Sequence, residues 1–105
     1  MLGDFMGKIQ EAQKQMEETK KKLSSIFVDA EVEGGLVKVK ADCNLRIVNL
    51  EISDHLFQNK DKSEIEDLII VAVNKTIEKA KEKQEVEMSK VAQGMLPNLG
   101  GLFGK

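Results

Sequence analysis

Two alternating segments meet at Gly34-Gly35, and this arrangement constrains the fold more than any other feature of the chain. Gly-Gly is a two-residue hairpin signal, because glycine adopts positive φ without steric cost. Strand side chains alternate between faces, so folding here gives one apolar face and one charged face. The apolar face pairs Val28 with Ala41, Ala30 with Val39 and Val32 with Val37; the charged face pairs Asp29 with Lys40 and Glu31 with Lys38. Opposite charges across a ladder stabilise one register.

A third strand is predicted over residues 45–52, after a two-residue turn at Cys43-Asn44. This turn would place Val48 opposite Val39 and Leu50 opposite Val37, which extends the apolar face across three strands. It would also turn Leu45 and Ile47 toward the charged face, either as a partner contact or as packing at the strand end.

Residues 2–26 follow a seven-residue apolar repeat, which predicts a helix with a coiled-coil-like seam. The seam consists of Leu2, Ile9, Met16 and Leu23 at one position and Phe5, Ala12, Thr19 and Ile26 at the other.

A second, longer helix is predicted to begin at Ser63 as N-cap, with Glu66 completing a capping box. Its apolar stripe comprises Ile65, Leu68, Ile69, Ala72, Val73, Ile77 and Ala80. Gly94 and Pro97 end it, so its length is of order 45 Å. The polar connection over 53–62 carries Leu56 and Phe57, which we expect to anchor on the core.

These elements define an α+β domain over residues 1–95: an N-terminal helix, a three-stranded antiparallel meander and a long C-terminal helix. Residues 96–105 form a Gly-rich tail that we expect to be flexible. Aromatic residues make up only 4% of the chain, with no Trp or Tyr. Two long helices on so small a sheet cannot bury their stripes alone, so we expect a two-fold homodimer.

The composition argues against several classes of function. No apolar run approaches the length of a membrane span, and the N-terminus lacks the pattern of a signal peptide. His55 is the only histidine and Cys43 the only cysteine, so no metal-ligand set of familiar spacing is present. We read His55 as a surface residue and Cys43 as a small turn residue rather than a nucleophile. We therefore expect no catalytic residue, metal, cofactor or small-molecule substrate.

Lysines on the helices are the remaining candidates for function. The net charge is −2, so no global basic field exists, and lysines mixed with glutamates are commonly just a solvated helix surface. A dimer doubles each patch and can align two patches along a duplex, with phosphate contacts and little sequence readout. The predicted DNA-binding residues on the helices are Lys8, Lys14, Lys20, Lys21, Lys22, Lys75, Lys79 and Lys83, and Lys38 on the charged face of the hairpin is a secondary contact.

Several short segments, in order, resemble the YbaB/EbfC nucleoid-associated proteins of bacteria. They are Phe5-Met6-Gly7-Lys8 before the Gln- and Lys-rich helix, Gly34-Gly35-Leu36-Val37-Lys38-Val39, Val48-Asn49-Leu50-Glu51-Ile52, the acidic run 64–69 with Ala72-Val73-Asn74, and Gly94-Met95-Leu96-Pro97. The family often has Gly in the turn where this chain has Asp42-Cys43-Asn44.

The resemblance implies a homodimer in which strands of both subunits associate and the helices project as tweezer-like arms. It further implies a cytoplasmic, nucleoid-associated protein that binds double-stranded DNA without cofactor, catalysis or membrane. The predicted dimer-interface residues are Val37, Val39, Leu45, Ile47 and Leu50. The alternative hypothesis is a non-catalytic adaptor or co-chaperone that clasps a protein through Met88, Val91 and Met95.

Overall fold

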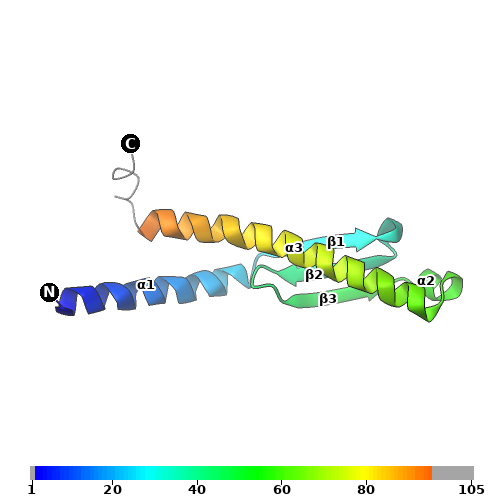
Figure 1. Cartoon of the computed structure of the whole chain (residues 1–105), viewed down its shortest axis with the longest axis horizontal. Helices are drawn as coiled ribbons and strands as arrows, with labels where there is room; N and C mark the ends of the chain where they lie inside the picture. Colours follow the sequence, from blue (N-terminus) through cyan, green and yellow to red (C-terminus); the bar gives the residue numbers. More distant parts are fainter. Residues whose placement is uncertain (1, 96–105) are drawn as a thin grey trace.

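The chain forms an elongated molecule with two helical arms at one end and a small sheet at the other (Figure 1). The structure, a computed structural model, describes residues 2–95, so the predicted tail lies outside the described residues. Its extents are 68 × 29 × 19 Å and its radius of gyration is 19.9 Å. A compact chain of this length would have a radius of gyration of about 13 Å.

The element order confirms the predicted α+β architecture of helix, three-stranded antiparallel meander and long helix. The elements are α1 (Leu2–Leu23), β1 (Phe27–Val32), a 3-10 turn (Glu33–Gly35), β2 (Val37–Asp42), β3 (Ile47–Ile52), α2 (Asp54–Asn59) and α3 (Lys62–Met95). The strands lie in the sheet in chain order, β1-β2-β3.

The hairpin between β1 and β2 has the predicted register. All five predicted pairs occur, from Val28 opposite Ala41 to Val32 opposite Val37. Gly34 has φ 64 and ψ 28, and Gly35 has φ 92, so both central residues have the positive φ that a type I′ turn requires. The Leu36 N–H closes this turn on the Glu33 carbonyl at 3.2 Å.

The predicted register between β2 and β3 is wrong by two residues. Val39 pairs with Leu50 rather than Val48, and Val37 pairs with Ile52 rather than Leu50. Nearer the turn the shift is only one residue, since Ala41 pairs with Ile47. The loop has three residues rather than two, because Leu45 adopts positive φ (66) and Asp42 N–H donates to the Arg46 carbonyl. A bulge near Lys40/Ala41 adds the second shift.

This correction changes the face assigned to Ile47. Directly paired residues share a face, so Ile47 lies on the apolar side with Ala41 and not on the charged side. The shift of two residues keeps Leu50 on the apolar side, as predicted.

The connection before α3 is a short helix, α2, rather than an irregular loop. Ser53 caps it by accepting a hydrogen bond from His55 N–H at 3.3 Å. Leu56 is fully buried, which confirms it as an anchor, but the prediction for Phe57 is wrong because this side chain is 58% exposed.

The predicted cap of α3 is also wrong. Asp61, not Ser63, is the N-cap, because its Oδ1 accepts a hydrogen bond from Glu64 N–H at 2.9 Å. The helix begins at Lys62 and runs for 34 residues, which corresponds to about 51 Å.

The core lies between α3 and the sheet. Val37 and Val39 of β2 pack with Leu56, Ile65 and Ala72. Thr76 is also fully buried, and its hydroxyl donates to the Ala72 carbonyl at 2.8 Å, so this polar residue fits a helix face of otherwise apolar side chains. The predicted stripe of α3 therefore covers β1 and β2, while β3 has far less contact with α3.

The two arms are α1 and the part of α3 that extends beyond the sheet (Figure 1). They touch along the C-terminal end of α1, where Thr19 and Leu23 are buried. Toward the N-terminus the predicted seam is open, because Leu2, Phe5 and Ile9 are exposed. The apolar repeat of α1 thus continues past the point where this chain covers it.

Candidate nucleic-acid interface

The lysines of α1 surround the helix rather than forming one stripe. All five predicted residues are exposed: Lys8, Lys14, Lys20, Lys21 and Lys22. At 3.6 residues per turn, Lys14 and Lys21 share a face opposite the buried Thr19 and Leu23. The arm therefore presents positive charge in several directions along its length.

The predicted lysines of α3 have different environments. Lys75 is exposed on the part of the helix that covers the sheet. The ammonium of Lys79 donates to the Asp29 carbonyl of β1 at 2.8 Å, which joins helix and sheet. Lys83 lies farther along, where α3 leaves the sheet and meets α1.

Three lysines converge at this meeting point around the carboxylate of Glu87. Lys22 of α1 lies 3.4 Å from Glu87 Oε1, and Lys83 lies 3.7 Å from Oε2. Lys90 donates to Oε2 at 3.2 Å. The structure thus brings together Lys22 and Lys83 from the predicted set, with Lys90, which the prediction omitted.

The electrostatics of the cluster favour a charged carboxylate. The hydrogen bond from Lys90 is the main cause that lowers the pKa of Glu87 below its ordinary value of 4.5; Lys22 adds to this effect, and burial opposes it. Glu87 is therefore ionised at neutral pH. A glutamate flanked by lysines four before and three after is a sequence signal for this group, but only the fold adds Lys22.

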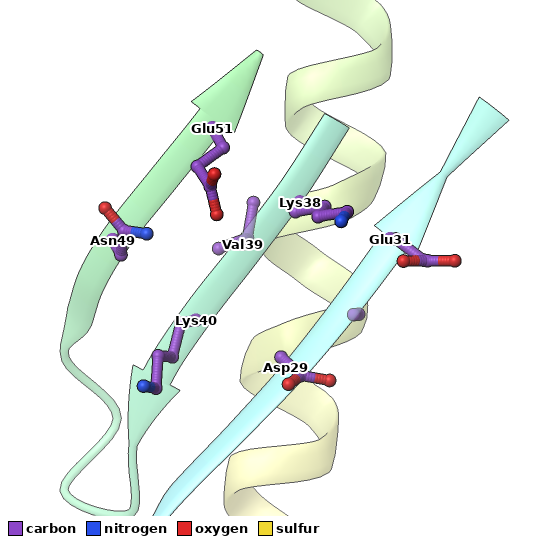
Figure 2. A pocket seen from close by; sticks show the side chains of 8 residues that line it. Asp29, Glu31, Lys38, Val39, Lys40, Asn49 and Glu51 are labelled. Carbon is purple, nitrogen blue, oxygen red and sulfur yellow. The ribbon is translucent and has the colours of Figure 1, made fainter. Parts of the chain in front are cut away.

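Lys38 lies apart from the arms, on the open face of the sheet. Figure 2 shows this face with α3 behind it, and a hollow of about 310 Å³ lies among its side chains. Lys38 stands between Glu31 on β1 and Glu51 on β3 in the strand register. The neighbouring Lys40 lies over the Phe27 ring, 4.7 Å from its centroid. This face carries both signs of charge and is not a positive surface.

Cys43 and His55 have no arrangement suited to catalysis. Cys43 is fully buried, and its N–H donates to the carbonyls of Leu23 and Ile26. Burial raises the pKa of its thiol, which opposes formation of a nucleophilic thiolate. His55 is exposed beside Asn59. Within residues 2–95, no group of three or more potential metal ligands gathers.

The predicted dimer-interface residues fall into two groups. Val37 and Val39 are buried in the core of the single chain, and Leu45 is half-buried in the turn after β2. Ile47 and Leu50 remain 41% and 43% exposed on β3, beside Val48. None of the helices in the described part of the chain is sufficiently long and apolar to span a membrane.

The described residues form a small α+β domain in which a three-stranded sheet carries two lysine-bearing helical arms. The chain belongs to the YbaB/EbfC DNA-binding family, whose model matches residues 1–95. This match confirms the family that the sequence motifs indicated.

Individual relatives align along almost the full chain. A nucleoid-associated protein of Flavobacterium johnsoniae is 36% identical, and the alignment covers 96% of this chain and 93% of the relative. A nucleoid-associated protein of Neisseria meningitidis is 34% identical, and the alignment covers 97% of this chain and 94% of the relative. The fold is similar to the crystal structure of an uncharacterized protein of Helicobacter pylori, with a TM-score of 0.75, 21% identity, and coverage of 91% of this chain and 97% of that one.

Proposed function

We propose that this protein binds double-stranded DNA in the bacterial nucleoid as a homodimer, mainly through contacts between lysines and phosphates. The observation that carries the proposal is the pair of arms: two long helices with exposed lysines project from one end of the sheet (Figure 1). Membership in a DNA-binding family supports duplex DNA as the partner.

The helical surfaces suit phosphate contact better than base recognition. Lysine is a flexible point charge that contacts phosphate without reading sequence. The chain has only 4% aromatic residues, and aromatic platforms are what single-strand binding uses. A role in organising the chromosome or modulating transcription, in the cytoplasm and without catalysis, fits this binding mode.

The homodimer is supported by apolar surface that one chain leaves uncovered. Ile47, Val48 and Leu50 are exposed on β3, and Ile70 and Val71 are exposed on α3. β3 is an edge strand, so its outer backbone groups are available to pair with another strand. Two-fold pairing through β3 would cover the β3 residues Ile47, Val48 and Leu50 and leave the four arms free.

Titration of a labelled duplex at several salt concentrations tests the proposal. Because each neutralised phosphate releases counterions, log affinity should fall linearly with log salt, with a slope of about −0.9 for each phosphate contacted. Competition with single-stranded DNA of equal length should be weaker than competition with duplex. Binding that is insensitive to salt, or no duplex binding at all, would contradict the proposal.

A protein-clasping module is the second candidate, favoured by the apolar end of α1. Leu2, Phe5, Met6 and Ile9 are exposed there, and such a stripe could pack against a partner helix. Of the α3 residues assigned to this role, Met88 and Val91 are half-buried. A stoichiometric protein partner from nuclease-treated lysate, combined with no duplex binding by the pure protein, would favour this candidate.

A further inference from the structure

The geometry points to Glu87 as a positioning residue for DNA binding: it gathers Lys22, Lys83 and Lys90 from both arms into one phosphate-binding cluster. This inference rests on the proposed function and adds to it a particular group of lysines. It also assigns a role to an acidic residue that lies among them.

Placing three ammonium groups close together is energetically unfavourable unless another group compensates. Like charges repel, and lysine side chains lose rotational freedom when they are held in one place. The two oxygens of Glu87 compensate for both costs, because Oε1 faces Lys22 across the gap between α1 and α3, while Oε2 contacts Lys83 and Lys90. Without this carboxylate the three groups would separate.

Exposure distinguishes the carboxylate from the lysines that surround it. The Glu87 side chain is only 6% exposed, whereas those of Lys22, Lys83 and Lys90 are 66%, 44% and 63% exposed. The carboxylate therefore lies beneath the ammonium groups and does not face an approaching phosphate. The group keeps a net charge of +2, contributed by three lysines and one glutamate.

Other lysines in the described part of the chain lack this combination of convergence and exposure. Lys79 is directed to the carbonyl of Asp29, and Lys38 stands opposite Glu31 and Glu51 in the strand register, so acidic residues flank it on both sides. Lys14 and Lys81 are exposed but make no ion pair within residues 2–95, so they serve as references for an ordinary lysine on α1 and α3.

A double-mutant cycle on duplex affinity tests the inference. In the otherwise native protein, Lys22→Ala should weaken binding roughly 3- to 10-fold more than Lys14→Ala, because it removes a member of an organised cluster. In a Glu87→Gln background the two alanine variants should weaken binding equally. The same comparison is made on α3, with Lys90→Ala as the cluster variant and Lys81→Ala as the reference. Because Lys90 and Glu87 lie on the same helix, this comparison does not depend on the contact between α1 and α3.

The salt dependence separates a binding role from a structural one. Lys22→Ala and Lys90→Ala each remove one lysine from both subunits, so each should reduce the magnitude of the slope of log affinity against log salt by about 2 for the dimer, which a change in folding alone would not do. Circular dichroism should show the same helix content in all variants.

Two outcomes would overturn the inference while the proposed function stands: equal losses for cluster and reference lysines in the native background, or an excess loss that persists with Glu87→Gln. If the native protein itself shows no salt-dependent duplex binding, the proposed function fails and the inference fails with it.

Discussion

Asp42 is a single residue that determines the course of the chain after the second strand. It is almost fully buried, and its Oδ1 accepts hydrogen bonds from the N–H groups of Asn44 at 2.9 Å and Arg46 at 3.1 Å. A carboxylate that binds the backbone two residues ahead forms an Asx turn, which favours a compact loop. Asp42 thus explains why this turn differs from a simple two-residue hairpin.

Removal of this carboxylate should destabilise the fold. Asp42→Ala leaves two N–H groups of the turn without acceptors, so the free energy of unfolding should fall by about 1–3 kcal/mol. Urea denaturation at one fixed protein concentration measures this change. Asp42→Asn keeps an acceptor oxygen and should lose less; equal losses for both variants would show that the hydrogen bonds are not the cause.

Gly34 is constrained by its backbone angles and not by space. Its φ is 64, and a Cβ atom on this residue would point into open space, with no atom beyond its chain neighbours within 4 Å. Gly34→Ala should therefore cost about 1–2 kcal/mol of unfolding free energy, because an L-residue is strained there. Gly7→Ala, in the helical φ range of α1 and equally uncrowded, should instead stabilise by up to about 1 kcal/mol. Thermal unfolding of both variants checks the opposite signs.

Among the elements, the β1–β2 hairpin was predictable and the third strand only partly so. Alternation and Gly34-Gly35 together allow one register for the hairpin. The β2–β3 register depends on Leu45 in a left-handed conformation and on a bulge near Lys40/Ala41, and neither has a glycine to indicate it. The face of Leu50 was nevertheless correct, because a shift of two residues preserves alternation.

The ends of α3 and its contact with α1 show a second limit of sequence reasoning. Ser63 and Asp61 are both good caps with a glutamate three residues later, and only the hydrogen bond to Glu64 distinguishes them. Likewise, heptad spacing predicts that α1 has a seam but not which part meets α3. The convergence of Lys22 with Lys83 and Lys90 depends on this long-range packing, so most of the candidate site needed the structure.

The stabilising contact that Glu87 makes between α1 and α3 should weaken at acid pH. Because the folded pKa of Glu87 lies below its ordinary value of 4.5, its contribution to stability is fully present above that value and is lost as pH falls through the folded pKa. Glu87→Gln removes this dependence. The stability difference between native protein and Glu87→Gln should therefore shrink as pH is lowered from 6 to about 3. A difference that is constant over this range would show that Glu87 does not titrate as the structure indicates.

At the scale of the whole molecule, one chain leaves its apolar surface unevenly covered. α3 lies over β1 and β2, so the core is complete on that side, while β3 keeps Ile47, Val48 and Leu50 exposed. The opposite face of the sheet is charged and needs no cover (Figure 2). A second copy placed along β3 would complete the core without touching the arms, which connects the fold to the proposed function.

Leu50→Lys tests this arrangement. The residue is 43% exposed in the single chain, so lysine can reach solvent there without unfolding the monomer, but a charge in a closed apolar interface is strongly unfavourable. Sedimentation equilibrium should show dimers for the native protein and monomers for Leu50→Lys. Phe57→Lys, at another exposed apolar position on α2, should remain dimeric.

Duplex binding by the same two variants then connects assembly to function. If two pairs of arms bind one duplex, Leu50→Lys should lose affinity and show a slope of log affinity against log salt near half that of the native protein, since a monomer contacts about half as many phosphates. Phe57→Lys should bind like the native protein. A dimeric Leu50→Lys protein would place the interface elsewhere, and a monomer with native affinity would show that a single pair of arms is sufficient.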